Sequence, residues 1–214
     1  MNKRLAIAFL FALALIASAA LPGAAEASVQ LQLGSTGGDV WDLQYRLKTL
    51  GYYELPLDGI YGQRTAEAVR KYQKNYGLPV DGVAGKRTWA SLKKNTLNQS
   101  EMDMMARIIH GEARGEPYEG QVAVGAVVMN RIRSPLFPDN IRGVVFQPGA
   151  FTAVDDGQYW LTPNKTAYLA ALDAVRGWDP THGSLYYFNP DTATSKWIWT
   201  RQQTVKIGRH IFAK

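Results

Sequence analysis

An eight-residue pattern occurs twice in the first half of the chain and constrains its fold more than any other feature. Asp58–Thr65 and Asp81–Thr88 both read D-G-x-x-G-x-R-T, at a spacing of 23 residues. Asp-Gly favours a turn, and the second glycine permits a positive φ or the close approach of another segment. Because a helical pattern follows each copy, the repeat predicts two turn-and-helix units. We interpret Asp58 and Asp81 as turn formers rather than as acids.

Another helical pattern precedes the repeat, so this half of the chain is expected to form three short helices. Asp39 is the predicted N-cap of the first helix, and Gly51 and Gly77 are the predicted ends of the first and second. The apolar stripes of the three helices comprise Val40, Leu43, Leu47, Leu50, Ala66, Val69, Tyr72, Tyr76, Trp89 and Leu92. At about 65 residues, a unit built around one such core is small but able to fold.

The start of this unit resembles a known module. Leu33–Leu47 reads L-G-S-T-G-G-D-V-x-x-L-Q-x-x-L, and together with the repeat it is similar to the three-helix type of peptidoglycan-binding domain. The resemblance covers residues 31–92 and implies a module that targets the cell wall. It assigns no individual ligand contacts, because the ligand groove varies within that family.

The N-terminus has the three parts of a secretory signal peptide. Lys3 and Arg4 precede an uninterrupted apolar run, Leu5–Leu21, and the small-residue site Ala25-Glu-Ala27 follows it. A transmembrane anchor, the alternative, needs roughly 20 apolar residues, and this run is somewhat shorter. We therefore expect cleavage after Ala27 and export of the mature chain.

Composition and charge exclude several classes of protein. The chain has no cysteine, which rules out a disulfide scaffold, a thiol nucleophile and any Cys-based metal centre. Its net charge is +6, of which residues 28–97 carry +4 and residues 98–214 carry +1. The basic residues are scattered rather than gathered in a tract, so nucleic acid is not an expected partner. For an exported protein with a mild positive charge, the anionic polymers of a cell wall are a more suitable partner than nucleic acid.

The second half contains one carboxyl group at a chemically suggestive place. Ser100-Glu-Met-Asp103 has the form of a capping box and predicts the start of a helix. Met105, Ile109 and Glu112 then lie on one face of that helix. A carboxyl group at the C-terminal end of an apolar stripe has its pKa raised by desolvation and by the helix dipole. Glu112 is thus a candidate general acid, although spacing alone leaves open an ordinary solvated carboxylate.

The next segment predicts the buried helix of this second half. Pro117 suits the first turn of a helix, with Glu116 and Glu119 near its N-terminus, where negative charge is favourable. Residues 122–132 are apolar on most sides, which is typical of a helix enclosed by others. Gly125 lies in this stretch and permits close packing.

The last third adds one helix and the best strand candidates in the chain. A helical stripe that includes Tyr168 begins at Thr162-Pro163 and ends at Gly177. Ser184–Phe188 and Lys196–Thr200 are short aromatic and β-branched runs, which predict a small hairpin or sheet. Their aromatic side chains either stack on sugars or pack in a core. The expected fold class is therefore mainly α or α+β.

The segment around Glu112 carries a second resemblance. Residues 106–132 read A-R-I-I-H-G-E-A-R-G-E-P-Y-E-G-Q-V-A-V-G-A-V-V-M-N-R-I and resemble the catalytic domain of the spore cortex-lytic enzymes, the cell-wall hydrolases of the SleB and CwlJ type. Further matching segments are Phe137-Pro138, Gln147–Thr152, Gly177–Thr181 and Tyr186–Pro190. The order of signal peptide (1–27), peptidoglycan-binding domain (28–97) and catalytic domain (98–214) is that of the SleB branch.

This resemblance implies a lysozyme-like or lytic-transglycosylase-like domain that cleaves cortex peptidoglycan during germination, between N-acetylmuramic acid and N-acetylglucosamine. The family's essential acid maps to Glu112. A lytic transglycosylase needs no second carboxylate, and we interpret Asp155 and Asp156 as a solvated turn. No metal or cofactor is implied. Substrate contacts are expected from Gln147, Phe151, Thr152, Tyr186, Tyr187 and Asn189.

Two other functions stay open. An N-acetylmuramoyl-L-alanine amidase would need three convergent zinc ligands, whereas His110, His182 and His210 form no H-x-E or H-E-x-x-H arrangement. We interpret His110 and His210 as packing or hydrogen-bonding residues. A non-catalytic wall-binding protein is the second alternative, against which the intact H-G-E-A segment argues. We expect peptidoglycan as the partner and a monomeric state. An inhibitory or stabilising spore protein stays open as a second partner.

Overall fold

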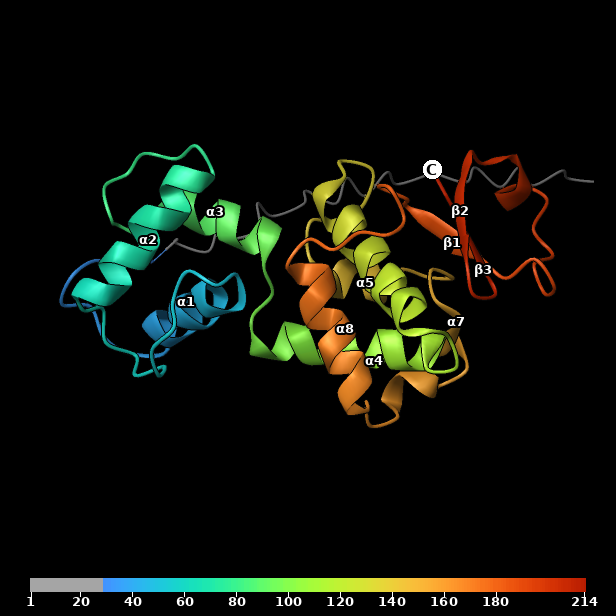
Figure 1. Cartoon of the computed structure of the whole chain (residues 1–214), viewed down its shortest axis with the longest axis horizontal. Coiled ribbons are helices and arrows are strands. Elements are labelled where there is room, and N and C mark those ends of the chain that lie inside the picture. The colour runs from blue at the N-terminus through green and yellow to red at the C-terminus, as the bar shows by residue number, and fades with distance from the viewer. Residues whose placement is uncertain (1–28) are drawn as a thin grey trace, which may run out of the picture.

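The computed structural model describes residues 29–214, and the predicted signal peptide lies outside these residues. Figure 1 shows an elongated molecule, with a small helical unit at one end and a larger unit of helices and a small sheet at the other. Each unit has its own buried hydrophobic core. The expected fold class is confirmed. Within the described residues, no helix is long and apolar enough to cross a membrane.

The small unit contains the three predicted helices. They are α1 (Gly38–Thr49), α2 (Gln63–Asn75) and α3 (Lys86–Asn95). Gly51 and Gly77 follow the first two helices with positive φ, as predicted. The prediction for Asp39 is wrong: Gly37 is the N-cap and has no side-chain cap, while Asp39 lies in the first turn. A carboxylate in that turn still interacts favourably with the helix dipole.

The two copies of the repeat form the same turn. Oδ1 of Asp58 accepts the backbone N–H of Ile60 at 2.9 Å, and Oδ1 of Asp81 accepts that of Val83 at the same distance. A glutamine from the preceding helix donates to each carboxylate at 2.7 Å, Gln44 in the first copy and Gln73 in the second. Both glutamines are buried. The interpretation of the aspartates as turn formers is confirmed.

The larger unit is built around one central helix. Its helices are α4 (Gln99–Ala113), α5 (Tyr118–Arg133), α6 (Ile141–Val145), α7 (Thr152–Asp155), the 3₁₀ helix η1 (Gln158–Trp160) and α8 (Lys165–Val175). As predicted, α5 is buried along most of its length, packed against α4 and α8. A Cβ on Gly125 would lie 2.9 Å from Cβ of Ala174, so only glycine lets α5 and α8 approach this closely.

The C-terminal part of the chain forms a three-stranded antiparallel sheet. It is formed by β1 (Tyr186–Phe188), β2 (Gln203–Ile207) and β3 (His210–Ala213), in the order β1-β3-β2. Tyr187 pairs with Phe212 in this register. Phe212 and Ile207 pack against Ala123 and Val127 of α5, which fixes the sheet on the central helix.

The strand predicted at Lys196–Thr200 is wrong. This segment forms a short 3₁₀ helix, η2 (Ile198–Thr200), in which Ile198 is buried while Trp197 and Trp199 stay exposed. The aromatic pattern is typical of a strand, but no strand pairs with the segment. The prediction of a strand over Ser184–Phe188 is confirmed by β1, which begins two residues later.

Two helix starts differ from their predictions. The N-cap of α4 is Asn98 rather than Ser100: its side chain accepts the N–H of Glu101 at 2.8 Å, and the Glu101 carboxylate accepts the N–H of Asn98 at 2.7 Å. This reciprocal pair is a capping box formed two residues earlier. Similarly, Asn164 caps α8 and accepts the N–H of Ala167 at 2.9 Å. In both cases the N-cap is an asparagine, a strong N-cap residue, which lies two residues before the predicted cap in α4 and directly after the predicted start in α8.

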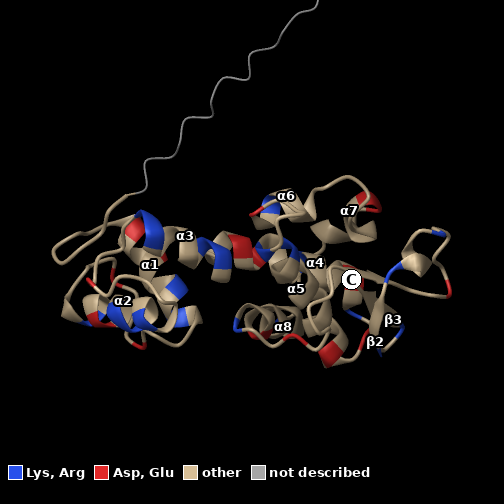
Figure 2. Ribbon diagram, turned by 90° about the horizontal axis from the view of Figure 1, so that it is seen from above, with Lys and Arg blue, Asp and Glu red and all other residues tan. Residues whose placement is uncertain are grey.

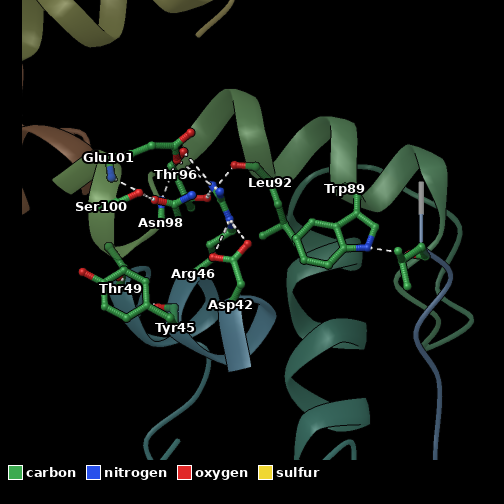
Figure 3. Close-up of polar contacts among 11 residues, drawn as sticks. Asp42, Tyr45, Arg46, Thr49, Trp89, Leu92, Thr96, Asn98, Ser100 and Glu101 are labelled. Carbon is green, nitrogen blue, oxygen red and sulfur yellow. Dashed lines mark hydrogen bonds and ion pairs between the residues drawn. The ribbon is translucent and has the colours of Figure 1, made fainter. Parts of the chain in front are cut away.

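One buried arginine joins the two units, as Figure 3 shows. Arg46 of α1 is 2% exposed and forms ion pairs with Asp42 at 3.0 Å and with Glu101 of α4 at 3.1 Å. Its Nη1 also donates to the carbonyl and hydroxyl oxygens of Thr96, at 3.1 Å each. The short connection between α3 and α4 is therefore packed: Thr96 and Leu97 are buried.

A second arginine adds a hydrogen bond between the two units. Arg176 follows α8, and its Nε donates to the carbonyl oxygen of Thr49 at 2.9 Å. Lys and Arg lie along α2 and α3 of the small unit (Figure 2), where residues 28–97 carry their excess of positive charge.

Candidate active site

Three elements meet at the carboxyl group of Glu112. This residue lies in the last turn of α4 and is half-buried. Its Oε1 accepts the backbone N–H of Ala153 in α7 at 2.6 Å, and its Oε2 accepts the hydroxyl of Tyr187 in β1 at 2.8 Å. The structure thus holds both carboxyl oxygens in fixed positions. Such positioning is what a group that transfers protons requires.

Gly111, the residue before Glu112, allows α7 to pack closely against α4. A Cβ on Gly111 would lie 2.6 Å from Cβ of Ala153, well inside van der Waals contact. Only a residue without a side chain therefore lets α7 approach α4 so closely. That approach brings the N–H of Ala153 within hydrogen-bond distance of Glu112.

The surroundings of Glu112 favour its protonated form. Burial raises the pKa of Glu112 above its usual range, against the opposing effects of the hydrogen bonds from Ala153 and Tyr187. Its position at the C-terminal end of α4 acts in the same direction as burial. Burial and the Glu112 carboxylate also hold the pKa of Tyr187 well above its usual range, so the phenol stays a hydrogen-bond donor.

Arg131 packs against aromatic residues of the site, and it was not predicted from the sequence. It is 6% exposed, and its guanidinium lies 5.0 Å from the ring centroids of Phe137 and Phe151 and 5.8 Å from that of Tyr186. Its Nε donates to the carbonyl oxygen of Leu185 at 2.8 Å, while one Nη is buried without a partner. An arginine within the buried helix was the available sequence signal, because such a charge is retained only with specific partners.

Glu112 lies in an open cleft of about 760 Å³, and most of the predicted contact residues line it. Five of these are Gln147, Thr152, Tyr186, Tyr187 and Asn189. Phe151 does not line the cleft: it is 2% exposed and packs beneath Arg131 and Tyr187, so its aromatic ring fills the core. The cleft also contains residues outside the predicted set, among them Arg131, Trp197 and His210.

His210 and the turn beside it secure the sheet at the cleft. The His210 ring lies 5.1 Å from the ring of Tyr187, and its Nδ1 is buried without a hydrogen-bond partner. Burial lowers the pKa of His210, which favours the neutral ring. Next to it, Arg209 donates to Glu116 through its backbone N–H at 2.9 Å and through Nε at 2.8 Å. The hairpin of β2 and β3 is thus tied to the start of α5.

No second carboxyl group shares the cleft within the described part of the chain. Asp155 and Asp156 are exposed, as predicted, although Asp155 is the last residue of α7 and only Asp156 lies in the turn, where it accepts the backbone N–H of Gln158 at 3.0 Å. Over residues 29–214, no group of three histidine, aspartate or glutamate side chains could hold a metal ion. The chemistry that this geometry offers is proton transfer by one carboxyl group.

The fold and this cleft define a cell-wall-degrading enzyme with an attached wall-binding domain. Residues 115–213 match the Cell Wall Hydrolase family, and residues 36–92 match the peptidoglycan binding domain family. A crystal structure of the catalytic domain of the Bacillus cereus SleB protein is 62% identical, with a TM-score of 0.54, and the match covers 56% of this chain and 94% of that one. The catalytic domain of the germination-specific lytic transglycosylase SleB from Bacillus anthracis is 64% identical, with a TM-score of 0.53, covering 55% and 97%.

Full-length relatives establish the family. The spore cortex-lytic enzyme of Bacillus cereus is 45% identical, and the match covers 86% of both chains. The spore cortex-lytic enzyme of Bacillus subtilis is 36% identical, and the match covers 86% of this chain and 89% of that one. The chain belongs to the spore cortex-lytic enzyme family, as its resemblance implied.

Proposed function

We propose that this enzyme cleaves the glycan strands of spore cortex peptidoglycan during germination, between N-acetylmuramic acid and N-acetylglucosamine, as a lytic transglycosylase. The observation that carries the proposal is the single half-buried carboxyl group of Glu112, held by Tyr187 and Ala153 in an open cleft. The description of the Bacillus anthracis relative as a lytic transglycosylase supports the same chemistry.

Glu112 acts twice in the proposed reaction. Its raised pKa keeps it protonated, so it donates a proton to the glycosidic oxygen as the bond to C1 of the muramic residue breaks. The carboxylate that results then accepts the proton of the C6 hydroxyl of the same muramic residue. That oxygen attacks C1 and closes a 1,6-anhydro ring. Glu112 returns to its protonated state, and no water is consumed.

The absence of a second acid from the described cleft fits this mechanism better than direct hydrolysis. Hydrolytic glycosidases use a pair of carboxyl groups, either about 5–5.5 Å or about 6.5–9.5 Å apart. Here Glu112 is the one acidic residue of the cleft within residues 29–214. An intramolecular hydroxyl needs no protein base beyond Glu112, because its effective molarity exceeds that of unactivated water.

The remaining cleft residues supply contacts to the sugar units. Gln147, Thr152 and Asn189 present hydrogen-bonding groups, and Tyr186 presents an aromatic ring at the same surface. Arg131 also lines the cleft, and its positive charge favours the carboxylate form of Glu112. Trp197 is 49% exposed at the rim and offers a stacking surface for a sugar ring.

We also propose that three parts of the chain have separate roles and that the mature enzyme acts outside the cytoplasm. Residues 1–27 direct export, residues 28–97 bind peptidoglycan and residues 98–214 cut it. The mild positive charge of residues 28–97 adds a screened attraction to an anionic wall. A monomeric state and an inhibitory or stabilising spore protein partner stay predictions.

Product analysis tests the proposed reaction. Digestion of purified cortex should yield new muramic ends about 18 Da lighter than hydrolytic reducing ends, because no water is added. These ends should resist reduction by borohydride. New ends that borohydride reduces would show hydrolysis by activated water. Release of peptides with intact glycan strands would indicate the amidase instead, and a zinc amidase would also lose activity with a chelator, whereas the proposed enzyme should not.

A further inference from the structure

Arg131 is a buried cation without an anionic partner. It is 6% exposed in the central helix α5, and none of the ion pairs within residues 29–214 involves it. By contrast, the similarly buried Arg46 pairs with two carboxylates. A buried charge without a counter-charge is costly, so an arginine in this position indicates a role beyond packing.

The contacts of Arg131 reach both elements that hold Glu112. Its guanidinium lies 5.0 Å from the ring centroid of Phe151, the N-cap of α7, and α7 donates a backbone N–H to Glu112. Its Nε donates to the carbonyl oxygen of Leu185, two residues before Tyr187, whose hydroxyl donates to the other oxygen of Glu112. One side chain of α5 therefore contacts the two segments that supply the hydrogen bonds to the carboxyl group.

Arg131 also acts on Glu112 through its charge. Both residues line the same cleft, and the guanidinium lowers the pKa of Glu112, whereas burial and the carboxylate of Asp156 raise it. Burial lowers the pKa of Arg131 itself, but a guanidinium stays protonated in proteins. The other titratable groups around Glu112 come from the sheet, from the turn after α7 and from the end of α4: Tyr187, His210, Asp156, His110 and Arg114.

The interaction between these two residues changes during the proposed reaction. While Glu112 is protonated, Arg131 faces a neutral group. Once the proton has moved to the glycosidic oxygen, the carboxylate supplies the negative charge that the buried guanidinium lacks. An interaction that strengthens as charge develops lowers the barrier of a reaction. Because ring contacts and the bond to Leu185 already fix Arg131, this stabilisation requires little reorganisation.

We propose that Arg131 is a positioning residue of the active site, which holds α7 and β1 at Glu112 and stabilises the carboxylate that forms when the proton leaves. The order of these proton transfers rests on the proposed function. The pairing of Arg131 with the ionised Glu112 does not depend on which product is formed. Arg131 acts through Glu112 and needs no contact with the substrate.

The first test is the pH dependence of kcat/KM on cortex. Arg131→Met keeps an unbranched apolar side chain and removes the charge, so Glu112 should become a weaker acid. The plateau of kcat/KM should fall roughly tenfold, which is part of the roughly 10²–10⁴ that a general acid contributes, and the alkaline limb should move to higher pH. Arg133→Met is the matched control, because Arg133 is a half-buried arginine of the same helix that does not line the cleft. Its alkaline limb should stay in place.

A limb that does not move in Arg131→Met, or that moves equally in Arg133→Met, would overturn the proposal. The first result would show that Arg131 only supports the packing of the site. The second would show that the effect is not local to the cleft.

A second measurement needs no substitution of Arg131 and decides the matter if Arg131→Met does not fold. In the wild-type protein, the nuclear magnetic resonance signal of its Nε–H should shift with pH at the midpoint reported by the carboxyl carbon of Glu112. This shift should disappear in Glu112→Gln. A signal that does not shift, or that still shifts in Glu112→Gln because His210 is the source, would refute the pairing. If the wild type cuts no glycan strand, the proposed function fails, and this titration still decides the role of Arg131.

Discussion

The hydroxyl of Tyr187 donates a 2.8 Å hydrogen bond to Oε2 of Glu112, across 75 residues of sequence. This bond joins the end of α4 to the first strand of the sheet. The phenol cannot replace the carboxyl group as an acid, because its own pKa is held well above the usual range. Its role is to orient the carboxylate and to stabilise it after the proton has left.

Replacing Glu112 with glutamine should abolish most of the activity without unfolding the protein. Glu112→Gln keeps the size of the side chain and removes the transferable proton, so the rate of cortex digestion should fall by roughly 10²–10⁴. Glu119→Gln is the control, since Glu119 is an exposed residue of α5. Circular dichroism should be unchanged for both variants. A Glu112→Gln enzyme that clears cortex at the wild-type rate would refute the assignment.

The pH dependence of kcat/KM should change when the hydrogen bond from Tyr187 to Glu112 is removed. The raised pKa of Glu112 means that activity is present below this pKa and is lost as the pH rises through it. Tyr187→Phe removes a hydrogen bond that favours the carboxylate, so the pKa of Glu112 should rise further and the alkaline limb of kcat/KM should move to higher pH. Tyr186→Phe removes a phenol from the same strand and should leave that limb in place. A shift to lower pH in Tyr187→Phe would contradict this account.

Gly111→Ala should damage the site through packing alone. The new methyl group would meet Ala153 at 2.6 Å and push α7 away from α4, which lengthens the bond from Ala153 to Glu112. We expect a loss of about 1–3 kcal/mol in the free energy of unfolding, together with reduced kcat. Gly38→Ala is the control, since a Cβ on Gly38 in α1 meets nothing within 4 Å. Its stability, measured by denaturant titration, should stay close to that of the wild type.

Burial should determine how much each of two otherwise similar ion pairs contributes to the free energy of unfolding. Arg46 pairs with Glu101 at 3.1 Å and is 2% exposed, whereas Arg64 pairs with Glu67 at 3.0 Å and is 75% exposed. Arg46→Met leaves two partly buried carboxylates and two oxygens of Thr96 without their partner, so it should lower stability by about 2–4 kcal/mol. Arg64→Met should change it by less than about 1 kcal/mol. Calorimetry should also show the two units unfolding more independently in Arg46→Met. Equal effects of both variants would mean that Arg46 does not couple the units.

Local patterns predicted the elements that depend on local physics. The three helices of the small unit, the paired turns at Asp58 and Asp81, and the buried α5 all follow from turn chemistry and periodicity. The helix that ends near Glu112 was predictable for the same reason. Boundaries were less accurate where an asparagine competed with the predicted start, as Asn98 and Asn164 do.

The site itself depends on contacts that no local pattern contains. The bond from Tyr187, the N–H from Ala153 and the ring contacts of Arg131 all join residues from different elements. The strand error at Lys196–Thr200 has a similar cause, because a strand requires a partner that the aromatic pattern does not specify. β2 and β3 went unpredicted, and they bury only one face against α5.

The packed connection between the units determines how a wall-bound molecule searches for bonds to cut. Thr96 and Leu97 are buried, and Arg46 of the small unit binds both Thr96 and Glu101 of α4. A flexible tether would let one binding event deliver the active site to many bonds within its radius. Here the cleft stays at one offset from the bound unit, so each binding event presents one stretch of strand. The pace of digestion is then limited by release and rebinding, and a mutation that tightens wall binding should slow the enzyme.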